Sequence, residues 1–187
     1  EGKLTKQHAW MHVLYGKEEL EAGKLEHAEQ LFMDGINMPK SYGEAKTFFN
    51  QEAHIYYYLG VLYEQQGDLE KAKAAFEDAA VYKAAVSEIS LFRALALKKL
   101  GREDEAKAVL DEMLATADNF IVNKDLRTYY GVGSPSPMPF EYDIEKNNLT
   151  DGNILKAFAL LGYDKVDEAK AAMDEARKLN PYDFRVF

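Results

Sequence analysis

A spacing of 34 residues relates two neighbouring segments of this chain. Gly67 and Gly101 lie 34 residues apart, and Ala72 and Ala106 have the same separation. A sequence that repeats with a period of 20 to 50 residues folds as a series of similar supersecondary units. Because one such unit cannot bury its apolar face alone, the units are expected to stack on one another as a solenoid.

Each unit is expected to be a pair of helices. Tyr56, Leu59, Gly60 and Tyr63 recur at intervals of three and four residues, which places them on one stripe of a helix. Gly67 follows this stripe and suits the left-handed residue that ends a helix. The pattern therefore predicts a helix that ends just before Gly67.

Small and acidic residues support a second helix in each unit. Gly60 and Ala72 lack bulk where the two helices approach, which leaves room for the ring of Phe76. Acidic side chains complement the positive end of a helix dipole. Such residues crowd the first turn of every expected second helix: Glu26, Asp68, Glu70, Glu103, Asp104, Glu105, Asp167 and Glu168.

The segment IYYYLGVLYEQQGDLEKAKAAFEDAA resembles a tetratricopeptide repeat, because its Tyr, Leu, Gly, Ala and Phe residues follow the order of that pattern. Residues at matching positions of the pattern recur in the other units: Leu110 in the next unit, Ala157 and Ala169 near the C-terminus, and Gly16 and Phe32 near the N-terminus. The resemblance implies an all-α fold, an α-solenoid of about four tetratricopeptide-like hairpins in one domain spanning 1–187. The units are expected at about 9–42, 53–86, 87–120 and 150–183.

A long insertion is expected at 121–149, before the last hairpin. It contains the helix-stopping residues Gly131, Gly133, Pro135, Pro137 and Pro139. Long insertions in compact arrays are usually functional or mobile.

Part of this insertion, TYYGVGSPSPMPFEYDI at 128–144, looks like the linker in a group of uncharacterised bacterial proteins. In that group a tetratricopeptide region follows a β-rich domain similar to sugar-mutarotase sandwiches. The likeness covers about 53–181, although this chain has Ser-Pro-Ser-Pro at 134–137 where the group usually has Leu-Pro-Asp. The resemblance implies a C-terminal module of a larger, carbohydrate-related protein and supplies no catalytic residues.

Charge and composition exclude several functions. The chain has 23 Lys and Arg against 32 Asp and Glu, a net charge of −9, which disfavours nucleic acids and anionic membranes as partners. No segment is long and apolar enough for membrane insertion, and no targeting segment is evident. We expect the chain to be soluble. Because it starts at Glu1 and not at Met, we expect it to be a fragment, and its sequence favours no particular compartment. Without cysteine there is no disulfide, thiolate metal site or cysteine nucleophile.

Catalytic and metal motifs are weak. His8 and His12 have the i, i+4 spacing that can present two imidazoles to one metal, but a third ligand is missing, so we expect a surface helix and no metal. Ser134 lies in no nucleophile elbow, and all four histidines precede residue 55, which leaves little for a catalytic triad. The fragment is therefore expected to be non-catalytic and to use no cofactor.

The side of each first helix that faces away from the core stripe is expected to line a concave groove. Aromatic and cationic side chains on such a surface suit an extended peptide or an amphipathic helix. The alternative is that residues of the insertion fold over the groove and make it core. The predicted groove residues are Trp10, Leu14, Lys17, His54, Tyr58, Val61, Phe92, Leu95, Lys99, Leu155 and Phe158.

Two functions from different classes follow. The first is a non-catalytic module that binds a protein segment or another domain of its own parent chain. The second is an accessory domain of a carbohydrate-active bacterial enzyme, which would contribute the 128–144 loop to the sugar site of a neighbouring domain. Partner identity and oligomeric state are not readable from the sequence.

Overall fold

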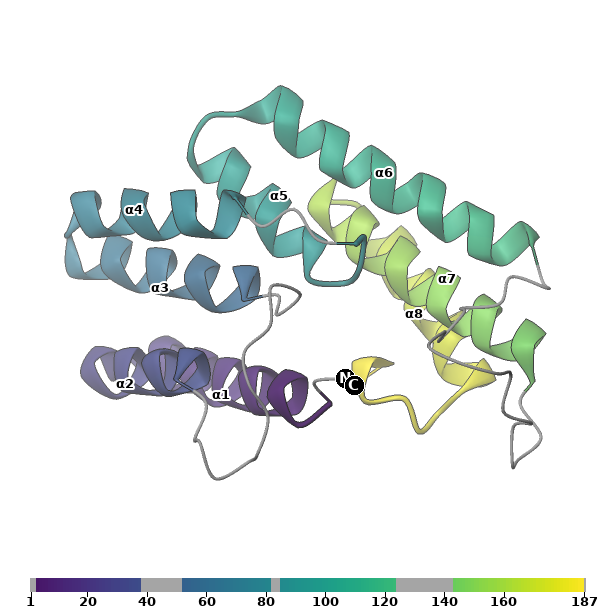
Figure 1. Cartoon of the computed structure of the whole chain (residues 1–187), viewed down its shortest axis with the longest axis horizontal. Coiled ribbons are helices and arrows are strands. Elements are labelled where there is room, and N and C mark those ends of the chain that lie inside the picture. The colour runs from purple at the N-terminus through teal and green to yellow at the C-terminus, as the bar shows by residue number, and fades with distance from the viewer. Residues whose placement is uncertain (1–2, 38–51, 82–84, 124–142, 187) are drawn as a thin grey trace, which may run out of the picture. The chain divides into compact units, whose positions relative to one another are not determined.

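A computed structural model describes residues 3–37, 52–81, 85–123 and 143–186, and these residues form helices joined by turns (Figure 1). The described residues contain no strand, so the predicted all-α class is confirmed. The elements are α1 (Lys3–Glu21), α2 (Leu25–Ile36), α3 (Ala53–Gln66), α4 (Leu69–Ala80), α5 (Ser90–Lys99), α6 (Glu103–Val122), α7 (Ile144–Gly162), α8 (Val166–Leu179) and the short 3-10 helix η2 (Phe184–Val186).

The chain divides into two compact units, Glu1–Val109 and Leu110–Phe187, so the division falls inside α6. In the first unit α1 packs on α2 and α3 on α4, and α5 packs against both α3 and α4. In the second unit α7 packs on α8, and η2 packs on α8. Consecutive helices therefore pair, as in a tetratricopeptide-like solenoid, while the predicted single domain and the limits of its repeats remain predictions.

The first two hairpins pack internally in the same way. A Cβ atom added to Gly60 of α3 would lie 2.6 Å from Cδ1 of Phe76 in α4, and one added to Gly16 of α1 would lie 2.7 Å from Cδ1 of Phe32 in α2. Both separations are too short for two carbon atoms in contact. Glycine is thus required where the ring of the second helix presses on the first, which confirms the role inferred for Gly60.

Left-handed residues end the first helices. Gly23, Gly67 and Gly101 have φ angles of 76°, 80° and 71°. In the last hairpin the corresponding conformation belongs to Asp164, with a φ of 59°. Aspartate visits this region more readily than most residues with a side chain. The turn after α7 therefore needs no glycine at position 164, and Gly162, two residues earlier, is the last residue of α7.

Capping residues set where two helices begin. The Asp68 carboxylate accepts a hydrogen bond of 3.1 Å from the backbone N–H of Lys71 at the start of α4. Asp143 accepts one of 2.9 Å from the N–H of Lys146 at the start of α7. Because Asp143 caps the helix there, residues 144–149 are helical, although the sequence placed them in the insertion. The acidic first turns expected for α2, α4, α6 and α8 are confirmed.

Most of the expected core residues are buried. Leu59, Phe76 and Leu110 are buried as predicted, whereas Tyr56 is only half-buried. Tyr56 packs at the edge of the clusters around Phe32 and Phe76 rather than inside one. The expectation that Tyr56 is buried is therefore wrong.

Candidate functional site

Equivalent positions on the first helices follow from the shared packing. Gly16 and Gly60 take the same place and lie 44 residues apart, and the 34-residue period relates α3 to α5. Three rows of equivalent residues result, with one residue from α1, one from α3 and one from α5 or the turn just before it. We call them the inner row (Trp10, His54, Glu88), the stacking row (Leu14, Tyr58, Phe92) and the open row (Lys17, Val61, Leu95).

The inner row is closed to a partner. His54 is buried, and its ring centroid lies 4.7 Å from that of Trp10 and 5.9 Å from that of Phe92. Among the described residues, neither ring nitrogen of His54 has a hydrogen-bond partner, and Nε1 of Trp10 has none either. Burial, helped by the charge of Lys6, lowers the pKa of His54 to about 3, so the ring is neutral at pH 7.

The same row ends in a buried carboxylate. Oε1 of Glu88 lies 2.6 Å from Nζ of Lys6, and the Glu88 side chain is almost fully buried. A buried carboxylate needs a paired cation. Lys6, whose charge also helps to lower the pKa of His54, therefore neutralises Glu88, and no side chain of the inner row except part of Trp10 reaches solvent.

Two residues of the stacking row, Tyr58 and Phe92, pack between hairpins, while Leu14 of α1 is exposed. Tyr58 stacks on Phe32 of the preceding hairpin with ring centroids 6.0 Å apart, and burial raises the pKa of Tyr58 to about 12. Phe92 is buried in a cluster with Phe76, Ala72 and Ala79 of the hairpin before it. The expectation that Tyr58 and Phe92 line a groove without packing a hairpin is therefore wrong. A first helix meets both its own partner helix and the preceding hairpin, so its apolar arc is wider than one stripe.

The open row keeps partly accessible side chains. Lys17 is exposed and pairs with Glu21 at 3.5 Å, while Val61 and Leu95 are half-buried. Beside this row Nζ of Lys99 lies 2.5 Å from Oε2 of Glu64 and 5.7 Å from the centre of the Phe76 ring. The open row thus joins the exposed Lys17 to two partly accessible apolar side chains, with the Lys99–Glu64 pair beside them.

The two predicted residues of the second unit have different surroundings. Leu155 is buried, and Phe158 is half-buried against Ile154, Ala176 and Val186. The predicted binding role of both residues remains a prediction. The 128–144 loop, apart from its last two residues, lies outside the described residues.

Sequence reasoning missed Tyr57 and Glu64. The ring centroid of Tyr57 lies 5.9 Å from those of Phe76 and Phe92, so it joins the packing between α3, α4 and α5. A signal was present, because three consecutive tyrosines at 56–58 span about 200° of a helix and must meet more than one neighbour. Glu64 carries no such signal, since its contact with Lys99 depends on the packing of α5 on α3.

His8 and His12 form hydrogen bonds with backbone carbonyl groups. Nε2 of His8 lies 2.8 Å from the carbonyl oxygen of Asp34, and Nδ1 of His12 lies 2.8 Å from that of His8. His8 is buried, so the expected surface position is wrong for it, because its hydrogen bond reaches across to α2. Over the described part of the chain, no three His, Cys, Asp or Glu residues are grouped as metal ligands.

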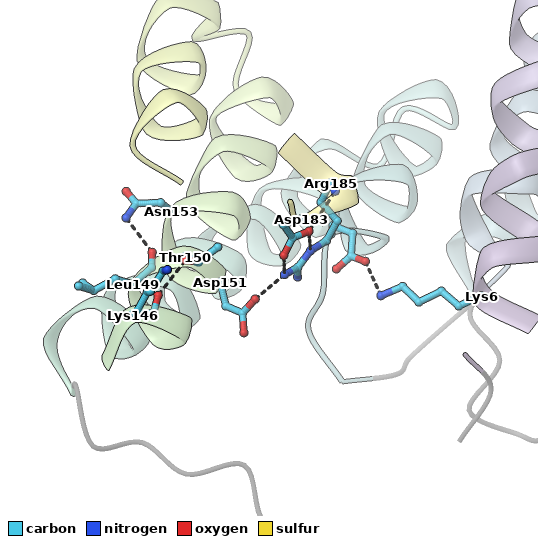
Figure 2. Close-up of polar contacts among 9 residues, drawn as sticks. Lys6, Lys146, Leu149, Thr150, Asp151, Asn153, Asp183 and Arg185 are labelled. Carbon is cyan, nitrogen blue, oxygen red and sulfur yellow. Dashed lines mark hydrogen bonds and ion pairs between the residues drawn. The ribbon is translucent and has the colours of Figure 1, made fainter. Parts of the chain in front are cut away.

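A second cluster of charges lies at the C-terminal segment. Nη2 of Arg185 lies 2.6 Å from Oδ1 of Asp151 in α7 and 2.6 Å from Oδ2 of Asp183, as Figure 2 shows. Burial alone would lower the pKa of Arg185, but the two carboxylates outweigh it and the pKa is raised. This cluster fixes η2 to α7 and leaves no free cation for a ligand.

Comparison with known families agrees with this geometry. The family model described as tetratricopeptide repeat matches residues 53–83, which span α3 and α4. Residues 53–83 are thus similar to a tetratricopeptide repeat. Tetratricopeptide repeats generally mediate protein–protein interactions, and the family is typically non-catalytic. A search of curated proteins found no match to the chain. None of the described helices has the length and apolar character needed to span a membrane.

Proposed function

We propose that the chain is a non-catalytic interaction module whose open row, in the first unit, binds a protein segment. The observation that supports this most is that Lys17, Val61 and Leu95 occupy one equivalent position on three first helices yet remain accessible. Because α1 contacts α3 and α3 contacts α5, these positions form a continuous row. Its ligand would be a peptide or helix from another protein or from another domain of the parent chain.

The chemistry of the row fits such a ligand. Val61 and Leu95 supply apolar contact, and Lys99 with Glu64 supplies charges of both signs at one side. Apolar contact supplies most of the affinity, and flanking charges select orientation. An extended segment or amphipathic helix with apolar residues over Val61 and Leu95 would meet both requirements.

The described groups of this face suit recognition rather than proton transfer. His54 of α3 is buried and neutral, and within the described part of the chain neither of its ring nitrogens has a hydrogen-bond partner. General acid–base catalysis needs a titratable group within hydrogen-bond reach of the substrate. The charged groups beside the row pair with each other, which suits recognition better than chemistry.

The proposal can be tested with a random peptide library displayed on phage and selected on the immobilised full chain. Selected peptides should bind Leu95→Asp and Lys99→Glu about tenfold more weakly or worse, since loss of one anchor corresponds to 1.4 kcal/mol or more. Leu161→Asp and Lys170→Glu, at exposed positions of the second unit, are matched controls and should bind as the parent does. Circular dichroism should first show that each variant is folded.

Equal affinity of the selected peptides for the parent chain and for Lys99→Glu and Leu95→Asp would contradict the proposal. Binding that is lost in the two control variants instead would move the site to the second unit.

A further inference from the structure

First helices bury one particular face against the second helix of the hairpin before them. We call it the stacking face, and it includes the stacking row. The positions in α7 follow from Ala157 and Ala169, which lie 97 residues after Gly60 and Ala72. The face consists of Ile55, Tyr58 and Leu62 in α3, of Phe92 and Ala96 in α5 with Ile89 at its N-cap, and of Gly152, Leu155 and Ala159 in α7. All of these residues are buried except Tyr58, which is half-buried.

Contacts in both units show what covers the stacking face. In the first unit Ile55 of α3 packs closely on Gly35 of α2, since a Cβ atom added to Gly35 would lie 3.3 Å from Cδ1 of Ile55. Phe92 of α5 packs with Phe76 of α4. In the second unit a Cβ on Gly152 would lie 2.7 Å from Cγ1 of Ile121 in α6. In each case the cover is the preceding second helix.

The equivalent face of α1 has no cover among the described residues. Met11, Leu14 and Glu18 correspond to Ile55, Tyr58 and Leu62, and Tyr15 corresponds to Leu59. Met11 is 46% exposed, and Leu14 and Tyr15 are each 57% exposed. Single exposed apolar residues are ordinary, but three adjoining ones on one helix face mark an interaction site.

Polar contacts also join each covering helix to the hairpin that it covers. Arg102, at the turn after α5, lies 3.2 Å from Glu77 of α4, and the Tyr63 hydroxyl of α3 donates a hydrogen bond of 2.9 Å to Glu29 of α2. Each interface therefore joins a donor near the first helix to an acid on the covering helix. The residue of the first hairpin that corresponds to Arg102 is Lys24, an exposed cation whose Nζ lies 3.0 Å from Oε2 of Glu19, much as Arg102 pairs with Glu105 as well as Glu77.

We infer that Met11, Leu14 and Tyr15 form a docking face for an amphipathic helix of another protein. The chain's own interfaces define the chemistry of that helix: small residues flanking an aromatic ring, with an acid directly after the ring. In α4 these are Ala72, Phe76, Glu77 and Ala79. The acid would pair with Lys24. The face is distinct from the open row, so this inference does not depend on the proposed function.

A second copy of the chain is a poorer occupant, because the matching face of its last second helix is already covered. Ala176 of α8 corresponds to Ala79 and packs with Val186 of η2. Nε of Arg177 donates a hydrogen bond of 3.1 Å to the Val186 carbonyl oxygen, and Nη2 donates one of 2.5 Å. A second copy would have to break these contacts before its α8 could cover α1.

The test is an NMR titration of the full, ¹⁵N-labelled chain with a side-chain-stapled peptide of the sequence 69–80, LEKAKAAFEDAA. Stapling is needed because a free helix of this length is marginal in water. Amide shifts should cluster at Met11, Leu14, Tyr15 and Lys24. Leu14→Glu in the chain, or alanine in place of the peptide's phenylalanine, should weaken binding about tenfold or more. Leu161→Glu is the matched control and should bind as the parent does.

Three outcomes would overturn the inference. The first is that amide shifts are absent at millimolar peptide, and the second is that they cluster at Val61 and Leu95 instead. The third is a dimer in sedimentation experiments that Leu14→Glu dissociates, which would make a second copy the occupant. The peptide-library test of the open row uses Leu95 and Lys99, so the two proposals can fail separately.

Discussion

The first two hairpins have the same interior and different exteriors. Gly16 faces Phe32 in one as Gly60 faces Phe76 in the other. The stacking face of α3 is largely buried on α2, whereas that of α1 exposes Leu14. The comparison teaches that the repeat pattern determines how a hairpin closes, while neighbours determine which of its apolar residues become core.

The largest expected effect tests burial at the stacking row. Phe92→Ala should lower the free energy of unfolding by about 3–5 kcal/mol, because it removes a buried ring and leaves a cavity between α4 and α5. Urea unfolding followed by circular dichroism measures this change. A decrease in the free energy of unfolding below 1 kcal/mol would mean that Phe92 is not a core residue. It would then support the groove position that the sequence predicted for Phe92.

The second prediction tests whether the two interiors are equivalent. Gly16→Leu and Gly60→Leu should each cost about 1–3 kcal/mol, because the new side chain must displace the ring of Phe32 or Phe76. Thermal unfolding of both variants checks it. If Gly16→Leu melts like the parent while Gly60→Leu does not, the first hairpin does not pack as the second does.

The third prediction uses His54, which occupies the inner row of the second hairpin where the first hairpin has Trp10. The pKa of His54 is lowered to about 3, against about 6.5 when unfolded. The unfolded state therefore binds the proton first, and stability is lost as pH falls below 6.5. Between pH 7 and pH 5 the loss attributable to His54 should be about 2 kcal/mol.

Urea unfolding of the parent and of His54→Leu at both pH values isolates the contribution of His54 to stability. The carboxylates titrate in both proteins, so their contribution cancels in the comparison. The difference in stability between them should shift by that amount in favour of the variant at pH 5. Parallel pH profiles would show that His54 is hydrated in the folded chain.

The smallest expected effect is at Leu14, the counterpart of Phe92. Leu14→Ala should change the free energy of unfolding by no more than about 0.5 kcal/mol, because the side chain is exposed. The same urea experiment measures it beside Phe92→Ala. A cost of several kcal/mol would show that another part of the chain covers α1.

The sequence was sufficient for the fold because the repeat pattern acts locally. The glycine at position 60, the left-handed Gly67 and the acidic helix starts all depend on contacts within one hairpin, and each was predicted correctly. Tyr58 and Phe92 were assigned wrongly because they contact the hairpin before their own. Asp164 was missed because an aspartate replaces the usual glycine in the left-handed turn.

The position of the unit boundary within α6 affects how the protein can be dissected. A fragment that stops at Val109 would keep only Glu103–Val109 of this helix, about two turns. So short a helix is marginal without packing. It would also lack Leu110 and Met113, which are fully buried in the intact chain. Expression of either unit alone therefore needs the whole of α6, and a shared helix of this kind makes overlapping fragments a better choice than adjacent ones.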